Sequence, residues 1–146
     1  MDIFNDIIGG LTGMTAGLWP QSSQSPGLFE GKLRPCPGTP NCVCSEVGTT
    51  AGQKIAPFVF TGSPEQAEVR LKQVVSALGG TIRHEEKGYV WSTFLVPVFG
   101  FTDDVEFRMD VQAGLIQVRS ASRIGYSDLG VNRSRVEQLR AAFEKP

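Results

Sequence analysis

The sequence predicts an α+β fold: a small antiparallel sheet of about three to four strands, with two helices packed on one face. Two patterns support this prediction. Residues 104–123 alternate between apolar and polar side chains as the strands of a hairpin do, and residues 63–78 and 132–144 place apolar side chains at helical spacing. The chain has 146 residues, which fits one domain.

The N-terminal residues differ in composition from the rest of the chain. Residues 2–11 predict a short helix with apolar side chains at helical spacing: Ile3, Phe4, Ile7, Ile8 and Leu11. Residues 19–31 are rich in Pro, Ser, Gln and Gly, which is typical of a linker. We therefore expect an N-terminal arm and linker at 1–31 and a single globular domain at 32–146. The arm has no Lys or Arg, which favours packing on the domain over anchoring to a membrane.

The first predicted helix of the domain has clear start and stop signals. Ser63 is a favourable N-cap, Pro64 suits the first helical position, and Gln66 completes a capping box. Gly79 then ends the helix. Residues 81–85 and 89–96 follow as a predicted hairpin, while residues 33–45 contain three prolines and predict an ordered, turn-rich loop.

The second hairpin separates an apolar face from a charged face. A two-residue turn at 113–114 would pair residue 108 with 119 and residue 104 with 123. This register places Arg119 and Arg123 beside Asp104 and Glu106 on the charged face. Ser120 lies on the opposite face, where a small side chain would let a helix approach closely.

The charged face and the residues after it form the main candidate site. The candidate residues combine guanidinium groups with acids near a predicted helix N-terminus: Arg119, Arg123, Arg133, Asp103, Asp104, Asp128 and Asn132. One hypothesis is a pocket in which the arginines bind a carboxylate or phosphate, helped by free N–H groups of the helix. The alternative is an internal salt-bridge network that ties the last strand to the last helix.

The three cysteines lie close together in the proline-rich loop. The Pro-Gly-Thr-Pro-Asn turn could bring Cys36 and Cys42 within bridging distance, but a disulfide, free thiols and a metal site all fit the spacing. An odd number of cysteines cannot all pair within one chain. A thiol-redox function through Cys36 and Cys42 is therefore a further alternative.

Composition narrows the classes of partner. The net charge is −1 and no basic stripe alternates with aromatics, so we expect no nucleic-acid binding. No run of apolar residues reaches the length of a membrane span. We expect a soluble cytoplasmic or stromal-like compartment, with export or membrane association as the alternative. Peripheral membrane contact could come from the arm or from Val98–Phe101, and no cofactor or metal is expected.

Three motifs resemble the domain-of-unknown-function 1499 family: Cys36–Val43, Gly100–Phe107 and Arg119–Arg135. The resemblance covers about Leu33 to Phe143. It marks these positions as signature residues: Cys36, Pro37, Pro40, Asn41, Cys42, Asp103, Asp104, Glu106, Arg119, Ser120, Ser122, Arg123, Asp128, Asn132, Arg133 and Arg135. The family usually has serine where this chain has Cys44, and it brings no established activity.

These observations favour a non-enzymatic binding or assembly module. We expect it to recognise an anionic ligand or a protein partner through the arginine and aspartate cluster, because no nucleophile lies near a suitable base.

Overall fold

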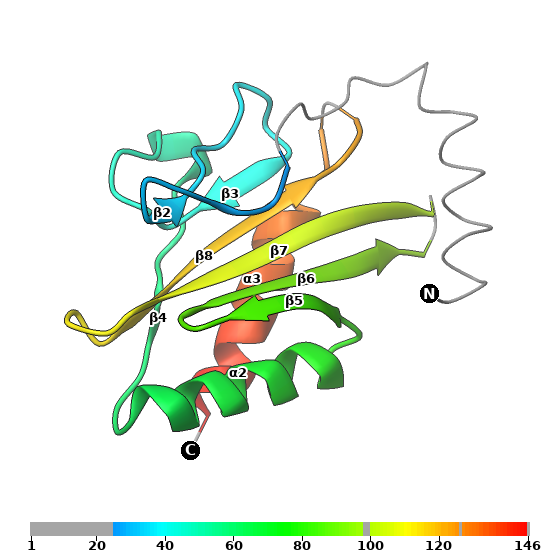
Figure 1. Cartoon of the computed structure of the whole chain (residues 1–146). Helices are drawn as coiled ribbons and strands as arrows, with labels where there is room; N and C mark the ends of the chain where they lie inside the picture. Colours follow the sequence, from blue (N-terminus) through cyan, green and yellow to red (C-terminus); the bar gives the residue numbers. More distant parts are fainter. Residues whose placement is uncertain (1–24, 98–99, 126, 146) are drawn as a thin grey trace.

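A six-stranded antiparallel sheet forms the centre of the computed structural model, which describes residues 25–97, 100–125 and 127–145 (Figure 1). The strand order is β3-β8-β7-β6-β5, and β4 also pairs with β8. The strands of this sheet are β3 (Cys42–Cys44), β4 (Phe58–Val59), β5 (Thr81–Glu86), β6 (Tyr89–Val96), β7 (Phe101–Asp110) and β8 (Leu115–Ser122). A separate hairpin joins β1 (Leu28–Phe29) to β2 (Lys32–Leu33), and the helices are η2 (Ala51–Gln53), α2 (Pro64–Ala77) and α3 (Val131–Glu144).

The predicted small sheet of three to four strands with two helices on one face is wrong. The described residues form a larger antiparallel sheet of six strands and a second sheet of two, so the fold is mostly β. Strand β3 lies in residues 33–45, where prolines predicted a loop, whereas β4 lies in residues 55–60, which predicted a short edge strand. The short strand β3 begins two residues after Pro40 and lies at the edge of the sheet, where a neighbouring proline is tolerated. Strand β4 pairs farther along β8.

The hairpin of β7 and β8 forms with a register two residues away from the predicted one. Residues 111–114 make a four-residue turn, closed by a 3.1 Å hydrogen bond from the Gly114 N–H to the Val111 carbonyl. Glu106 therefore lies directly opposite Arg119. A shift of two residues leaves every side chain on its predicted face, because side chains alternate with a period of two.

The two helices complete the main hydrophobic core. Ser63 caps α2 by accepting a hydrogen bond from the Gln66 N–H, and Pro64 is the first helical residue, as predicted. The core cluster combines buried residues of both helices with buried residues of the sheet. Among its fully buried members are Leu71 and Val75 of α2, Val136 and Leu139 of α3, and Phe58, Val105, Phe107 and Val118 of the sheet.

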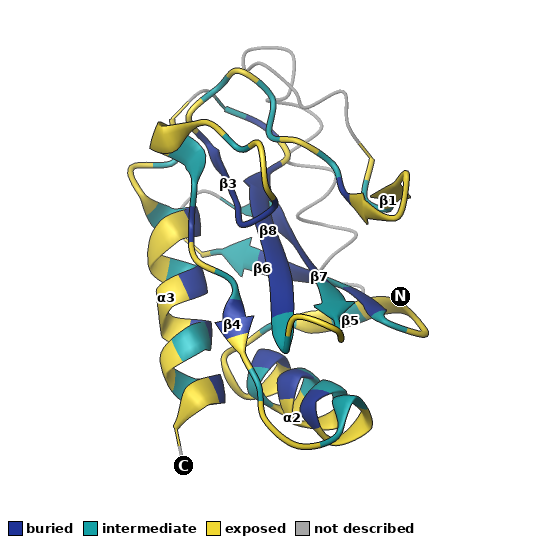
Figure 2. Cartoon of the chain, turned by 90° about the vertical axis from the view of Figure 1, so that its left-hand side faces the viewer, coloured by how far each residue is buried: buried dark blue, intermediate teal, exposed yellow. Residues whose placement is uncertain are grey.

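The β7–β8 hairpin is covered on both sides. We call the side that carries Val105 and Val118 the helix face, because α3 packs against it, and the side that carries Glu106 and Arg119 the covered face. Figure 2 shows α3 on one side of the sheet and the β1–β2 hairpin on the other. The Gly27 N–H of this hairpin segment donates to Glu106, and Leu33 packs with Tyr89.

Two expectations fall partly or wholly on residues outside the described ranges. The predicted helix at 2–11 is outside them, as are Val98 and Phe99. Phe101, at the start of β7, is half-buried. In the part of the chain that the structure describes, no helix has the length and apolar character needed to cross a membrane.

Candidate functional site

Arg119 forms a buried ion pair on the covered face. Its guanidinium lies 3.4 Å from the Glu106 carboxylate, and these residues are only 3% and 1% exposed. Glu106 also accepts hydrogen bonds from the Tyr89 hydroxyl and the Gly27 N–H, at 2.7 and 2.8 Å. Burial, together with the adjacent Glu106 carboxylate, raises the pKa of Tyr89. The charge of Arg119 is thus matched inside the protein.

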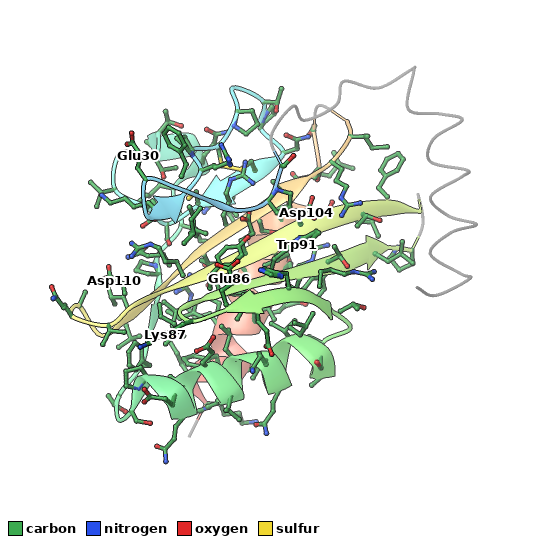
Figure 3. All side chains as sticks on the ribbon, in the orientation of Figure 1. Glu30, Glu86, Lys87, Trp91, Asp104 and Asp110 are labelled. Carbon is green, nitrogen blue, oxygen red and sulfur yellow. A yellow bond between two sulfur atoms is a disulfide. The ribbon has the colours of Figure 1, made fainter. Side chains whose placement is uncertain are left out.

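Arg123 pairs with Asp104 in a more open setting. Two guanidinium nitrogens of Arg123 each lie 3.0 Å from a carboxylate oxygen of Asp104, which also accepts a 2.9 Å hydrogen bond from the Trp91 indole. Figure 3 shows Asp104 and Trp91 close together on the sheet. The Arg123 side chain is 48% exposed, so this pair lies at the border of the covered face.

A third pair on the covered face joins Arg108 to Glu46. The guanidinium of Arg108 donates two hydrogen bonds to Glu46, at 3.0 and 2.7 Å, and the Leu33 N–H donates a third to the same carboxylate. These contacts raise the pKa of Arg108, chiefly through the hydrogen bonding to Glu46. This pair was not predicted from the sequence, because Glu46 lies in a loop whose position relative to β7 no local pattern indicates.

Arg133 points to a different part of the molecule. It lies on the exposed side of α3 and donates to the backbone carbonyls of Lys54 and Gly52, at 3.0 and 3.2 Å. Arg119, Arg123 and Arg133 therefore each have internal partners in different places. The structure does not bring the three predicted arginines together around one pocket.

On the helix face, Asn132 joins α3 to the end of β8. Asn132 is completely buried at the start of α3. Its side-chain oxygen accepts hydrogen bonds from the Ser120 hydroxyl at 2.6 Å and from Arg135 at 3.1 Å. Its side-chain nitrogen donates to the Asn41 carbonyl, the Ser122 hydroxyl and the Asp128 carboxylate. The small serines let α3 approach β8, as the sequence predicted.

Asp103 is the buried acid of this face. It is 1% exposed, and its carboxylate lies 2.8 Å from a guanidinium nitrogen of Arg135. Burial raises the pKa of Asp103, although Arg135 and a hydrogen bond from Ser122 partly offset this effect. Arg135 was not among the predicted site residues. Its spacing from Asn132 could have indicated it, because residues three apart in a helix lie on the same helix face.

Asp128 accepts hydrogen bonds from backbone N–H groups at the start of α3. Its carboxylate accepts from the N–H groups of Gly130 and Asn132, at 2.8 and 3.0 Å, and its backbone carbonyl accepts from the Val131 N–H. The predicted anion site relied on free N–H groups at this helix end. In the structure, an internal carboxylate uses them.

The cysteine loop is held against the same region. Cys36 and Cys42 form a disulfide, one of the three alternatives that the sequence left open, and Cys44 is a buried free thiol whose pKa is raised by burial. Within the loop, the Asn41 side chain donates to the Gly125 carbonyl at 2.7 Å, and the Asn41 carbonyl accepts from the Ser122 N–H at 3.0 Å. The loop thus positions the β8–α3 connection.

A pocket of about 290 Å³ lies between the ends of β6 and β7 and the connection from β8 to α3. Its walls are mainly apolar, with a few polar side chains: Val96, Phe101, Ile124, Gly125, Leu129 and Val131, with Asp103, Ser122, Ser127 and Asp128. Leu129 is 87% exposed and has a left-handed backbone with φ of 54°, so it forms a raised edge of this pocket. No sequence pattern predicted the pocket, because its walls come from three separate segments of the chain.

These features define an antiparallel sheet domain with an internal acid–arginine network and a mainly apolar pocket. The chain belongs to the family described as "Protein of unknown function (DUF1499)", whose model matches residues 32–143. No curated protein matches the chain, and no solved structure does.

Proposed function

We propose that this domain is a non-enzymatic binding module that takes a small, mainly apolar ligand into the pocket beside the start of α3. The observation that carries the proposal is the composition of that pocket. Small-molecule sites are typically concave and apolar, with a few fixed polar groups, and their volumes begin near ~300 Å³. Here the fixed polar groups are Asp103, Ser122 and Asp128, which belong to the motifs that resemble the family.

The acid–arginine cluster supports a structural function better than anion binding. Arg119 is buried against Glu106, and Arg133 is bound to backbone carbonyls. A buried, matched pair has little capacity left for an external carboxylate or phosphate. We propose that these contacts stabilise the domain, so that the structural hypothesis and the binding hypothesis apply to different residues of one domain.

Titration with 1-octanol, followed through backbone amide chemical shifts, tests the binding proposal. We expect saturable shifts at Ser122, Ile124 and Gly125. Val131→Phe should abolish them, because a larger side chain fills the pocket from α3. Val69→Phe is the matched control, since Val69 is exposed on α2 away from the pocket and should leave binding unchanged. Shifts scattered over the surface, or equal binding by the Val131→Phe variant, would contradict the proposal.

A further inference from the structure

We infer that the pocket selects apolar ligands with a hydrogen-bond-donating head group, such as an alcohol or a primary amine, over ligands with a carboxylate head. This inference rests on the proposed binding function and names its ligand class. Backbone donors beside the pocket are already used internally, whereas acceptors remain available and the charged side chains that line it are acidic.

The backbone N–H groups beside the pocket at the start of α3 have internal acceptors. The N–H groups of Gly130, Val131 and Asn132 donate to Asp128, and the Leu129 N–H donates to the Ser127 hydroxyl. Each N–H carries one hydrogen, so these groups have none left for a ligand. A carboxylate head needs donors, and those at this helix end are occupied.

The acceptors retain capacity. A carboxylate has about four lone-pair sites, and a hydroxyl oxygen has two. The Asp128 carboxylate accepts three short contacts, from Gly130 and from two nitrogens of Asn132. The Ser127 oxygen accepts one, from Leu129. Both side chains line the pocket, and neither is buried. A hydroxyl or ammonium head could therefore donate to either of them.

The charges act in the same direction. Asp103 and Asp128 line the pocket, and no Lys or Arg is among the described lining residues. The Arg135 guanidinium is close by, but it lies 2.8 Å from Asp103 and matches that charge. Among the described residues, Asp128 is the lining acid that forms no ion pair. An anionic head would be repelled there, whereas an ammonium head would be attracted.

The size of the pocket indicates which probes to use. At the ~30 Å³ that a water molecule occupies in the liquid, about 290 Å³ corresponds to about ten water-sized groups. Octyl compounds, with about nine or ten non-hydrogen atoms, are a suitable match. The probes are 1-octanol, octylamine and octanoate, each titrated at neutral pH while the amide shifts of Ser122 and Gly125 are followed.

We expect octylamine and 1-octanol to bind at least tenfold more tightly than octanoate. Equal or tighter binding of octanoate would overturn the inference while leaving the binding function intact. If none of the three probes shifts the pocket amides, the proposed function itself fails. The two failures are therefore distinguishable in one set of titrations.

Two further measurements test the electrostatic cause. Asp128→Asn keeps an acceptor oxygen at the start of α3 but removes the charge, so the preference for octylamine over octanoate should narrow several-fold while 1-octanol binding is kept. Glu65→Gln, an exposed acid in the first turn of α2, is the matched control and should change nothing. In the unaltered protein the preference should also shrink as salt rises from 0.1 to 1 M, because the screening length falls from ~10 to ~3 Å. A preference insensitive to both changes would overturn the inference.

Discussion

The two faces of the β7–β8 hairpin treat their charges differently. On the covered face, Arg119 is enclosed with Glu106 under the β1–β2 hairpin segment, and each has further hydrogen bonds. On the helix face, Asp103 is paired with Arg135, while Asp128 is used to cap α3 beside an apolar pocket. On the covered face the buried charges are paired with each other. On the helix face, hydrogen-bond acceptors remain available beside the pocket.

This difference assigns stabilisation of the domain and ligand binding to different residues, although both sets lie within one stretch of the sequence, residues 103–135. The covered face can stabilise the domain but offers little surface to a ligand, since its charges already have partners. The end of the helix face has a hollow that no side chain in the described residues fills, together with polar groups that can orient a ligand. The largest stability effects should therefore come from the covered face, and the largest binding effects from the helix face.

The largest expected loss of stability follows Arg119→Ala. The substitution leaves the buried Glu106 carboxylate without its cation, which should lower the free energy of unfolding by about 3–5 kcal/mol. Urea unfolding measures the loss as a lower midpoint with an unchanged slope. The double variant Glu106→Gln with Arg119→Met should recover most of the loss, because the amide still accepts from Tyr89 and no charge remains buried. A loss below about 1 kcal/mol would mean that the covered face is not the stabilising one.

A smaller loss should follow removal of the disulfide. The Cys36→Ala, Cys42→Ala double variant releases a short loop, with a separation of six residues, and should lower the free energy of unfolding by about 2 kcal/mol. The amides of Ser122 and Gly125 should also shift, because both contact Asn41. Reductant should lower the unfolding midpoint of the unaltered protein but not that of the variant. No effect of reductant on the unaltered protein would contradict the prediction.

Local sequence patterns predicted the elements well where one segment determines its own structure. Ser63, Pro64 and Gln66 define the start of α2 by capping, and the alternation in residues 104–111 assigns each side chain of β7 to its face. The predicted register differs from the observed one by two residues. An even shift leaves the apolar and polar side chains on the same faces, so only the length of the turn can distinguish the possible registers. The four-residue turn has no Asn-Gly signal to show its length.

The parts that failed depend on contacts between distant segments. The edge strand β3 forms because Cys42–Cys44 finds a partner in β8, which its prolines gave no reason to expect. The partner of Arg108 is Glu46, and the pocket is assembled from β6, β7 and the β8–α3 connection. The residue types in the sequence indicated a charged cluster. Only the fold determines which of these charges pair with each other inside the protein.

The pH dependence of stability should show the effect of burying Asp103. Burial raises its pKa above the ordinary value of 3.8, so the folded state holds this proton more tightly than the unfolded state. As pH rises from below 3.8 through the raised pKa, the unaltered protein should lose stability relative to Asp103→Asn. Unpaired Arg135 in the variant adds a constant offset, because it stays charged throughout. Urea unfolding of both proteins between pH 3 and 8 measures the difference, and a difference that grows in favour of the unaltered protein would contradict the assigned direction.

The smallest effect should follow Arg123→Ala. Arg123 directly follows β8, the strand that contains Arg119, and lies at the open border of the covered face. Its side chain is 48% exposed, so solvent screens its pair with Asp104, and we expect a loss of at most about 1 kcal/mol. The Trp91 indole still donates to Asp104 in the variant, which keeps that carboxylate hydrogen-bonded.

The same variant also tests the anionic-ligand hypothesis, because the Arg123 side chain is 48% exposed, whereas Arg119 is buried. Thermal unfolding with added inorganic phosphate should raise the midpoint equally for the unaltered protein and the variant, as a general salt effect does. A rise that is lost in Arg123→Ala would instead identify Arg123 as an anion contact. If Arg123→Ala lost as much stability as Arg119→Ala, breaking an exposed ion pair would cost as much as breaking a buried one. That result would contradict the distinction between the buried centre of the covered face and its exposed border.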